Sequence, residues 1–258
     1  MKSLTIEFKQ ITKWRSLSHL SPPVLDDMSW KLAGAGVHAL LGPNGSGKST
    51  SLQLILGLLI PDYGEISVMD FHPTQARQYL SSIMGFVPDT PPLYPNLTVL
   101  EYLRYLFEIR VDPELLKDKA KCKKKWDAQF EKIVSVLQLS TWLQKRCSQL
   151  SYGIKGRVAL AQGFIHDPFM IIMDEPTKGL DPESLVLVRS FFQMEKLTKF
   201  LLYCTHQLRD LPLMSDSVSI LTRGKIIYHA HISEIPANMD FESLYLKTVK
   251  SNEITHHP

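Results

Sequence analysis

A glycine-rich segment with one lysine is the part of this sequence best suited to chemistry. It follows an apolar run at residues 37–41 and reads Gly42-Pro43-Asn44-Gly45-Ser46-Gly47-Lys48-Ser49-Thr50. Its glycines let the backbone curl so that successive N–H groups point at an anion, aided by the positive end of a following helix. The segment therefore predicts a P-loop in which Lys48 contacts the β- and γ-phosphates, Ser49 ligates Mg²⁺ and Thr50 adds a phosphate contact.

Two adjacent carboxylates, Asp174 and Glu175, form the second candidate centre. They come directly after residues 169–173, an uninterrupted apolar run that predicts a central strand. The carboxyl ends of such strands are where α/β sheets place ligands. We expect Asp174 to hold Mg²⁺ through water and Glu175 to polarise the water that attacks the γ-phosphate. The alternative, an ordinary solvated turn, is weaker because the P-loop supplies a metal for these acids.

The surrounding pattern predicts the elements that position both centres. After residue 153 a helix, the strand at 169–173, a second helix and a strand at 200–204 follow one another, and a β-like piece covers residues 217–221. This order is typical of an α/β fold with a mainly parallel sheet. A helical run at residues 52–59 follows the P-loop, and apolar residues at helical spacing in 99–109 and 130–143 indicate a helical subdomain.

Composition excludes several classes of function. The net charge of +3 over 258 residues is too small for the basic surface that phosphate-backbone binding requires, so no nucleic-acid partner is expected. The cysteines, three in number and widely spaced, fit neither a disulfide framework nor a zinc site. The most apolar stretch, residues 52–60, is about half the roughly 20 residues needed to cross a bilayer.

The lysine-rich residues 117–126 would either touch an anionic membrane surface or form a solvated helix face.

A third motif narrows the choice among P-loop proteins, which include kinases, GTPases, helicases and transport ATPases. Leu150-Ser151-Tyr152-Gly153-Ile154 resembles the LSGGQ signature of the ABC ATPase family, and Asp174 lies at the usual distance after it. Further matches are Gly179-Leu180-Asp181, at the family's D-loop, and Thr205-His206, at its switch histidine. The resemblance implies that Ser151, Gly153 and Asp181 serve an ATP site shared between two cassettes, and that His206 contacts the γ-phosphate and the attacking water.

The resemblance also implies a fold and a function. The fold would be an α/β P-loop core over residues 1–240, with an N-terminal antiparallel β-subdomain and an inserted helical subdomain at about 90–150, followed by a tail at 241–258. The function would be ATP binding and hydrolysis for an ABC transporter, at the cytoplasmic face of the membrane, beside a transmembrane permease and a second, identical or paralogous cassette. The segment at residues 91–110 resembles the drug-resistance and sodium-efflux exporter branch.

Three departures from the family pattern bear on this interpretation. Asp89 stands where the Q-loop usually has Gln, and its carboxylate is a candidate Mg²⁺ ligand in the closed state. Tyr152 and Ile154 replace Gly and Gln in the signature, which predicts slower turnover. Trp14 is nearest to the position of the adenine-stacking aromatic residue, although packing beneath the first strands is an equal alternative.

Two rival functions remain compatible with these motifs. The first is an ABC ATPase acting in DNA repair or translation, which usually has a long coiled-coil insertion or two cassettes in one chain; the sequence has neither. The second is an ATP-dependent regulatory module without real turnover. Intact Lys48, Glu175 and His206 argue against the second rival.

Overall fold

The computed structural model describes residues 3–15, 21–236 and 240–254. The chain divides into two compact units, one formed by Met1–Arg77 with Leu202–Pro258 and the other by Gln78–Leu201. The two units are described separately below.

The first unit begins with an antiparallel sheet of three strands. Its order is β2 (Leu25–Ala33), β1 (Thr5–Lys13) and β4 (Tyr63–Val68). Buried and exposed side chains alternate along β2 from Met28 to Ala33, as in a strand with one face on a core. Trp30 on this strand is buried and donates its indole N–H to Ser219 Oγ at 2.9 Å. The expected N-terminal antiparallel subdomain is confirmed.

The remaining strands of the first unit carry the P-loop. The strand β3 (Gly36–Leu41) is buried along its full length and pairs in parallel with β8 (Ser217–Thr222), which pairs antiparallel with β9 (Lys225–His231). On its other side β3 neighbours β7 (Phe200–Thr205), which begins at the end of the second unit. The helices are α1 (Lys48–Ile55), α8 (Leu211–Met214) and α9 (Phe241–Ile254), with a 3₁₀ turn at Ile232–Glu234.

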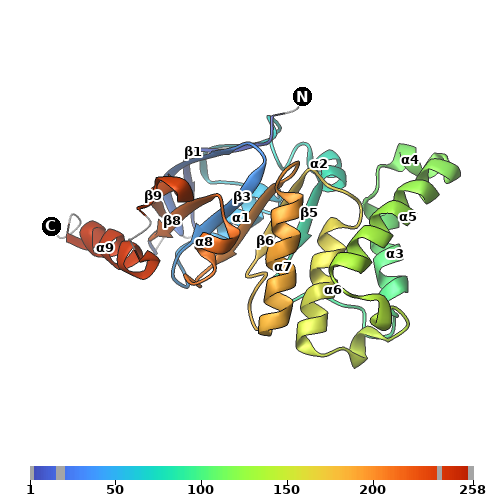
Figure 1. Ribbon diagram of the computed structural model, residues 1–258. Coiled ribbons are helices and arrows are strands. Elements are labelled where there is room, and N and C mark those ends of the chain that lie inside the picture. Colours follow the sequence, from blue (N-terminus) through green and yellow to red (C-terminus); the bar gives the residue numbers. More distant parts are fainter. Residues whose placement is uncertain (1–2, 16–20, 237–239, 255–258) are drawn as a thin grey trace. The chain divides into compact units, whose positions relative to one another are not determined.

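The second unit places two parallel strands beside a group of helices. The strand β5 (Met84–Val87) pairs with β6 (Met170–Asp174), and α2 (Arg77–Ile83), α6 (Tyr152–Phe164) and α7 (Pro182–Glu195) flank them in sequence. Between β5 and α6 lie α3 (Val99–Arg110), α4 (Pro113–Lys117), α5 (Lys119–Val136) and 3₁₀ turns at Ser140–Trp142 and Cys147–Gln149. This interval is the expected helical subdomain, drawn in green in Figure 1.

Local sequence explains how this helical interval is built. Thr98 and Glu101 form a capping box at the start of α3, with Thr98 N–H donating to Glu101 at 2.8 Å. The buried phenol of Tyr102, one turn on, donates to Gln162 Oε1 of α6 at 2.5 Å. The apolar face of α3 therefore packs toward α6, joined by one buried polar contact.

Three boundaries differ from the sequence expectation. The helix after the P-loop is α1, which starts at Lys48 and ends at Ile55, because Gly57 adopts a φ of 65° soon after. The helix expected at residues 130–143 starts earlier, at the Asp118 cap, and ends at Val136, because Gln138 has a φ of 51°. The region assigned to a C-terminal tail forms α9 as far as Ile254.

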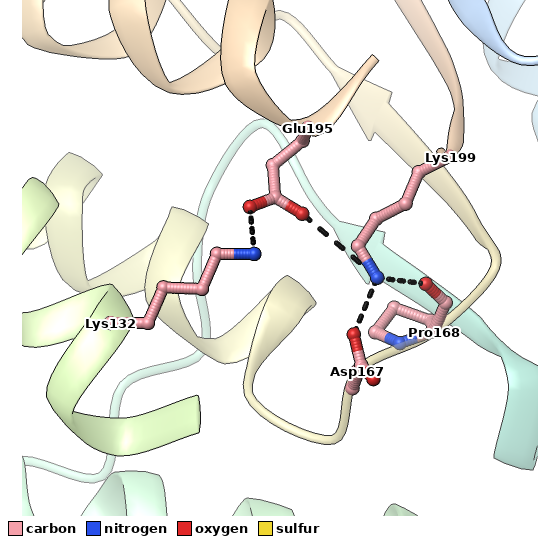
Figure 2. Close-up of polar contacts among 5 residues, drawn as sticks. All are labelled: Lys132, Asp167, Pro168, Glu195 and Lys199. Carbon is pink, nitrogen blue, oxygen red and sulfur yellow. Dashed lines mark hydrogen bonds and ion pairs between the residues drawn. The ribbon is translucent and has the colours of Figure 1, made fainter. Parts of the chain in front are cut away.

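A cluster of four charged side chains joins helices of the second unit (Figure 2). Glu195 at the end of α7 is 2% exposed, and Lys132 of α5 approaches it to 2.5 Å. Lys199 lies 3.9 Å from Glu195 and donates to Asp167 Oδ1 at 2.5 Å and to the Pro168 carbonyl at 2.8 Å. The two lysines and two acids balance in charge, which makes the burial of Glu195 tolerable.

The cysteines Cys122, Cys147 and Cys204 are all free thiols and all buried. Burial raises the pKa of the Cys147 thiol. The free thiols agree with the interpretation from spacing that these residues form no disulfide framework.

Candidate active site

The P-loop is held by contacts within the first unit. Gly42 N–H donates to the Thr205 carbonyl at 3.4 Å, and Gly224 N–H donates to the Ser46 carbonyl at 3.1 Å. Gly47 has a φ of 113°, and a Cβ there would lie 2.6 Å from a methyl of Leu25, so only glycine fits before α1. The P-loop is thus hydrogen-bonded at Gly42 to the end of β7 and at Ser46 to the turn between β8 and β9.

Two side chains of the loop suit a phosphate group. Lys48 is 7% exposed, and its ammonium donates to the carbonyls of Gly42 at 2.7 Å and Pro43 at 3.1 Å. Ser46 Oγ is buried and has no hydrogen-bond partner among the described residues. A buried hydroxyl without a partner is costly unless a ligand satisfies it. Together with the N–H groups that begin α1, these donors fit a bound phosphate.

Asp174 is the last residue of the buried strand β6 in the second unit, and Glu175 follows it. Both side chains are half-buried. Glu175 has a φ of 49°, an uncommon conformation for a residue other than glycine, and its carbonyl accepts from the Lys178 N–H at 3.0 Å. Within the described part of the chain, no group of three or more His, Cys, Asp or Glu is arranged to hold a metal. A Mg²⁺ ion here would therefore depend on phosphate oxygens as well as on protein ligands.

The signature residues and the D-loop come together in the second unit. Ser151 caps α6, accepting from Ile154 N–H at 3.5 Å, and Asp181 caps α7, accepting from Ser184 N–H at 2.8 Å. A Cβ on Gly153 would lie 2.6 Å from Asp181 Oδ2, so the two motifs are in direct contact. The hydrogen bond from the Ser184 backbone holds the pKa of Asp181 below its usual value.

Asp89 has a partner that the sequence expectation missed. Both of its carboxylate oxygens accept from Lys178 Nζ at 2.9 Å. These hydrogen bonds, with the carboxylate charge, raise the pKa of Lys178. The sequence did contain one signal for this salt bridge, the lysine between Glu175 and Asp181. A carboxylate at position 89, where the family usually has a neutral Gln, is stabilised by a cation nearby.

His206 and Trp14 lie in the first unit. His206 follows β7 and is exposed, while the next residue, Gln207, donates its N–H to Thr205 Oγ1 at 3.0 Å. Trp14 follows β1, is half-buried, and donates its backbone N–H to Asp62 at 2.8 Å. Its ring meets that of Tyr63 edge-on, with centroids 6.0 Å apart. The P-loop and these two residues share one unit, whereas Asp89, the signature and the carboxylates belong to the other.

Comparison with known proteins identifies the family. The family model described as "ABC transporter" matches residues 25–178, which is more than half of the chain. The chain belongs to the ABC transporter family. The match runs from β2 through the P-loop, the signature and both carboxylates of this ABC protein to Lys178.

Relatives of this ABC protein are named as an ABC transporter and as an export ATP-binding protein. The Dictyostelium discoideum protein named "ABC transporter G family member 20" is 30% identical over 96% of this chain and 33% of its own length. The Rhizobium etli "Nod factor export ATP-binding protein I" is 32% identical over 86% of this chain and 66% of its own length. The chain thus spans only a third of the first relative and about two thirds of the second.

Solved structures agree with the fold of this ABC protein. A structure described as the ATP-binding subunit of an ABC transporter matches with a TM-score of 0.80 at 24% identity, over 95% of this chain and 99% of that one. A dimeric ATP-binding cassette, described as a post-hydrolysis state bound to ADP and Pi, matches with a TM-score of 0.74 at 21% identity, over 88% and 98%. The α/β P-loop fold with a mostly parallel sheet is confirmed. In the described residues, every helix is too short or too polar to cross a membrane.

Proposed function

We propose that this chain binds and hydrolyses ATP and thereby powers transport through a separate transmembrane permease. The observation that carries the proposal is the P-loop, where three groups form a set of donors for phosphate: the buried Lys48 ammonium, the Ser46 hydroxyl, which has no partner within the described ranges, and the start of α1. Membership of the ABC transporter family supports ATP as the nucleotide.

The proposed chemistry assigns a task to each candidate residue. Lys48 and Thr50 bind phosphate oxygens, and Ser49 and Asp174 would hold Mg²⁺. Asp89, the third candidate ligand, would have to release Lys178 in the closed state before it could reach the metal. Bound Mg²⁺ would neutralise charge on the phosphates. Glu175 accepts a proton from the attacking water, and His206 orients that water against the γ-phosphate.

The proposed assembly is a head-to-tail pair of cassettes, with either a second copy or a paralogue. Ser151, Gly153 and Asp181 would then complete the ATP site of the partner cassette, while Trp14 stacks on adenine. A structural relative described as dimeric supports the pairing. The relative named for Nod factor export supports export as the direction of transport. The cytoplasmic face of the membrane is the location that we propose for the chain.

Steady-state ATPase assays on the purified chain test the proposal. Lys48→Ala should abolish nucleotide binding and turnover, because it removes the charge that faces the phosphates. Lys117→Ala, which breaks an exposed ion pair with Glu114 on α4, is the matched control and should behave as wild type. Absence of Mg²⁺-dependent ATPase activity in the wild-type chain, both alone and with a co-purified membrane partner, would refute the proposal.

A further inference from the structure

Two residues at which the chain departs from its family pattern lie around a single turn of the second unit. This turn, residues 175–181, runs from Glu175 to the cap of α7. A cavity of about 320 Å³ borders it and is lined by three segments of the chain, within residues 87–95, 147–159 and 175–180. Asp89 comes from the first of these segments and Tyr152 from the second.

Lys178 links the Asp89 segment to the turn. Its ammonium lies 2.9 Å from both Asp89 oxygens, which are 89 residues away in sequence. The side chains are 47% and 36% exposed, so the pair contributes little to the free energy of unfolding. Its effect is instead geometric, because the ammonium contacts both carboxylate oxygens and so ties the Lys178 side chain to the Asp89 segment.

The backbone of Lys178 is connected directly to Glu175. The Lys178 N–H donates to the Glu175 carbonyl at 3.0 Å, which closes the turn. Glu175 itself adopts a φ of 49°, a conformation that persists in residues other than glycine only when the surroundings hold it. Restraining Lys178 therefore restrains the residue whose carboxylate is proposed to activate water.

Tyr152 supplies a second restraint on the same turn. A Cβ on Gly179 would lie 2.4 Å from Cε1 of the Tyr152 ring, so the ring lies flush against the backbone beside Lys178. The usual glycine at position 152 would leave this side of the turn open. Asp89 and Tyr152 thus hold adjacent residues of one turn from two different segments.

We infer that Asp89 and Lys178 are positioning residues, and that their salt bridge holds the Glu175 turn in its catalytic geometry. The inference rests on the proposed role of Glu175 as the base. It also gives Asp89 a task that does not require a metal, since both of its oxygens are engaged by Lys178.

Three variants test the salt bridge: Asp89→Asn, Lys178→Met and the swap Asp89→Lys/Lys178→Asp. Each single variant should lower kcat about tenfold while KM for ATP changes less than about twofold, because the geometry of the base and not nucleotide binding is altered. The swap should recover most of the loss. Melting temperatures should stay at the wild-type value. Lys123→Met, which breaks the exposed pair with Asp127 on α5, is the matched control and should leave kcat unchanged.

Hydrogen–deuterium exchange provides a readout independent of activity. The amides of residues 175–181 should exchange faster in both single variants, return toward wild-type rates in the swap, and stay unchanged in Lys123→Met. Wild-type kcat and exchange in Lys178→Met would overturn the inference. A swap that restores neither quantity would also overturn it. If Asp89→Asn raises the Mg²⁺ concentration needed for half-maximal activity while Lys178→Met is normal, Asp89 is a metal ligand and the inference is wrong.

The failure of the inference differs from the failure of the proposed function. A wild-type chain without ATPase activity would refute the proposed function. The exchange experiment would still report whether the salt bridge restrains the turn. Unchanged exchange in the variants, with normal ATPase activity in the wild type, would refute the inference alone.

Discussion

Gly153 of α6 touches Asp181 at the start of α7 within the same chain, since a Cβ at residue 153 would lie 2.6 Å from Asp181 Oδ2. Asp181 cannot move aside freely, because its oxygens also accept from the backbone N–H and the hydroxyl of Ser184, each at 2.8 Å. A large residue at 153 would therefore disturb the contact between α6 and α7. The effect of such a substitution on dimerisation could therefore not be distinguished from its effect on the packing of α6 against α7.

Ser151 offers a cleaner test of the shared ATP site. It is exposed and caps α6, and Asp is as good a cap as Ser. Ser151→Asp should abolish ATP-induced dimerisation, because it places a negative charge toward the partner's phosphates, while ATP affinity of the monomer stays unchanged. Sedimentation and nucleotide titration measure the two effects. Ser151→Asn, equal in size but neutral, is the control and should still dimerise; equal loss in both variants would contradict the shared site.

Glu175→Gln should retain ATP binding and lose turnover. The amide fills the same space but cannot accept a proton, so kcat should fall about 10²- to 10⁴-fold. ATP should also trap the dimer, seen as a stable larger species in sedimentation. Glu183→Gln, an exposed change on α7, is the control. Normal turnover in Glu175→Gln would remove Glu175 from the mechanism.

Removing Lys132 from the charged cluster of Figure 2 should lower the free energy of unfolding more than removing Glu195. Lys132→Met leaves Glu195 buried and 3.9 Å from its remaining cation, so we expect a loss of about 3 kcal/mol in the free energy of unfolding. Glu195→Leu removes the buried charge, and Lys199 keeps Asp167 and the Pro168 carbonyl, so the loss should stay below about 1.5 kcal/mol. Urea unfolding measures both; a larger loss in Glu195→Leu would contradict this account.

Acid should destabilise the protein through two buried histidines. Burial lowers the pKa of His38 to about 4 and of His166 to about 3. In the unfolded chain the pKa is about 6.5, so below that pH protons bind the unfolded state preferentially. Each histidine therefore removes about 1.4 kcal/mol per pH unit as the pH falls from 6.5 to its folded pKa.

His166→Gln tests this dependence. The loss in free energy of unfolding between pH 7 and 5 should be about 2 kcal/mol smaller than in wild type. Urea titrations at both pH values provide the measurement. The exposed His231→Gln is the control and should show the wild-type loss. An unchanged pH dependence in His166→Gln would show that His166 is not responsible.

The sequence predicted those parts of the fold and site that depend on local pattern. The P-loop lies between a strand and a helix, and Asp174 ends a buried strand, because apolar runs and glycine turns are local signals. The salt bridge between Asp89 and Lys178 was not predicted. The lysine after Glu175 was a hint that a cation lies nearby, but its pairing with Asp89 joins segments far apart in sequence and depends on how β5 and β6 pair.

Helix boundaries show the same limit. The lysine-rich residues before Trp126 belong to α5, because Asp118 caps the helix and the burial of Cys122 and Trp126 fixes one face of it. Apolar periodicity alone placed the helix too late. The helix α9 extends to Ile254, although the residues from 251 onward have no apolar periodicity that would predict a helix.

The burial of all three cysteines makes the natural sequence a convenient background for site-specific labelling. Thiol reagents react with the exposed thiolate, and here each thiol is buried, with the pKa of Cys147 raised further. A cysteine introduced at an exposed position, such as Ser190 on α7, should therefore be modified far faster than the native ones. Fluorophores attached in this way would report distances between cassettes during turnover without prior removal of any native cysteine.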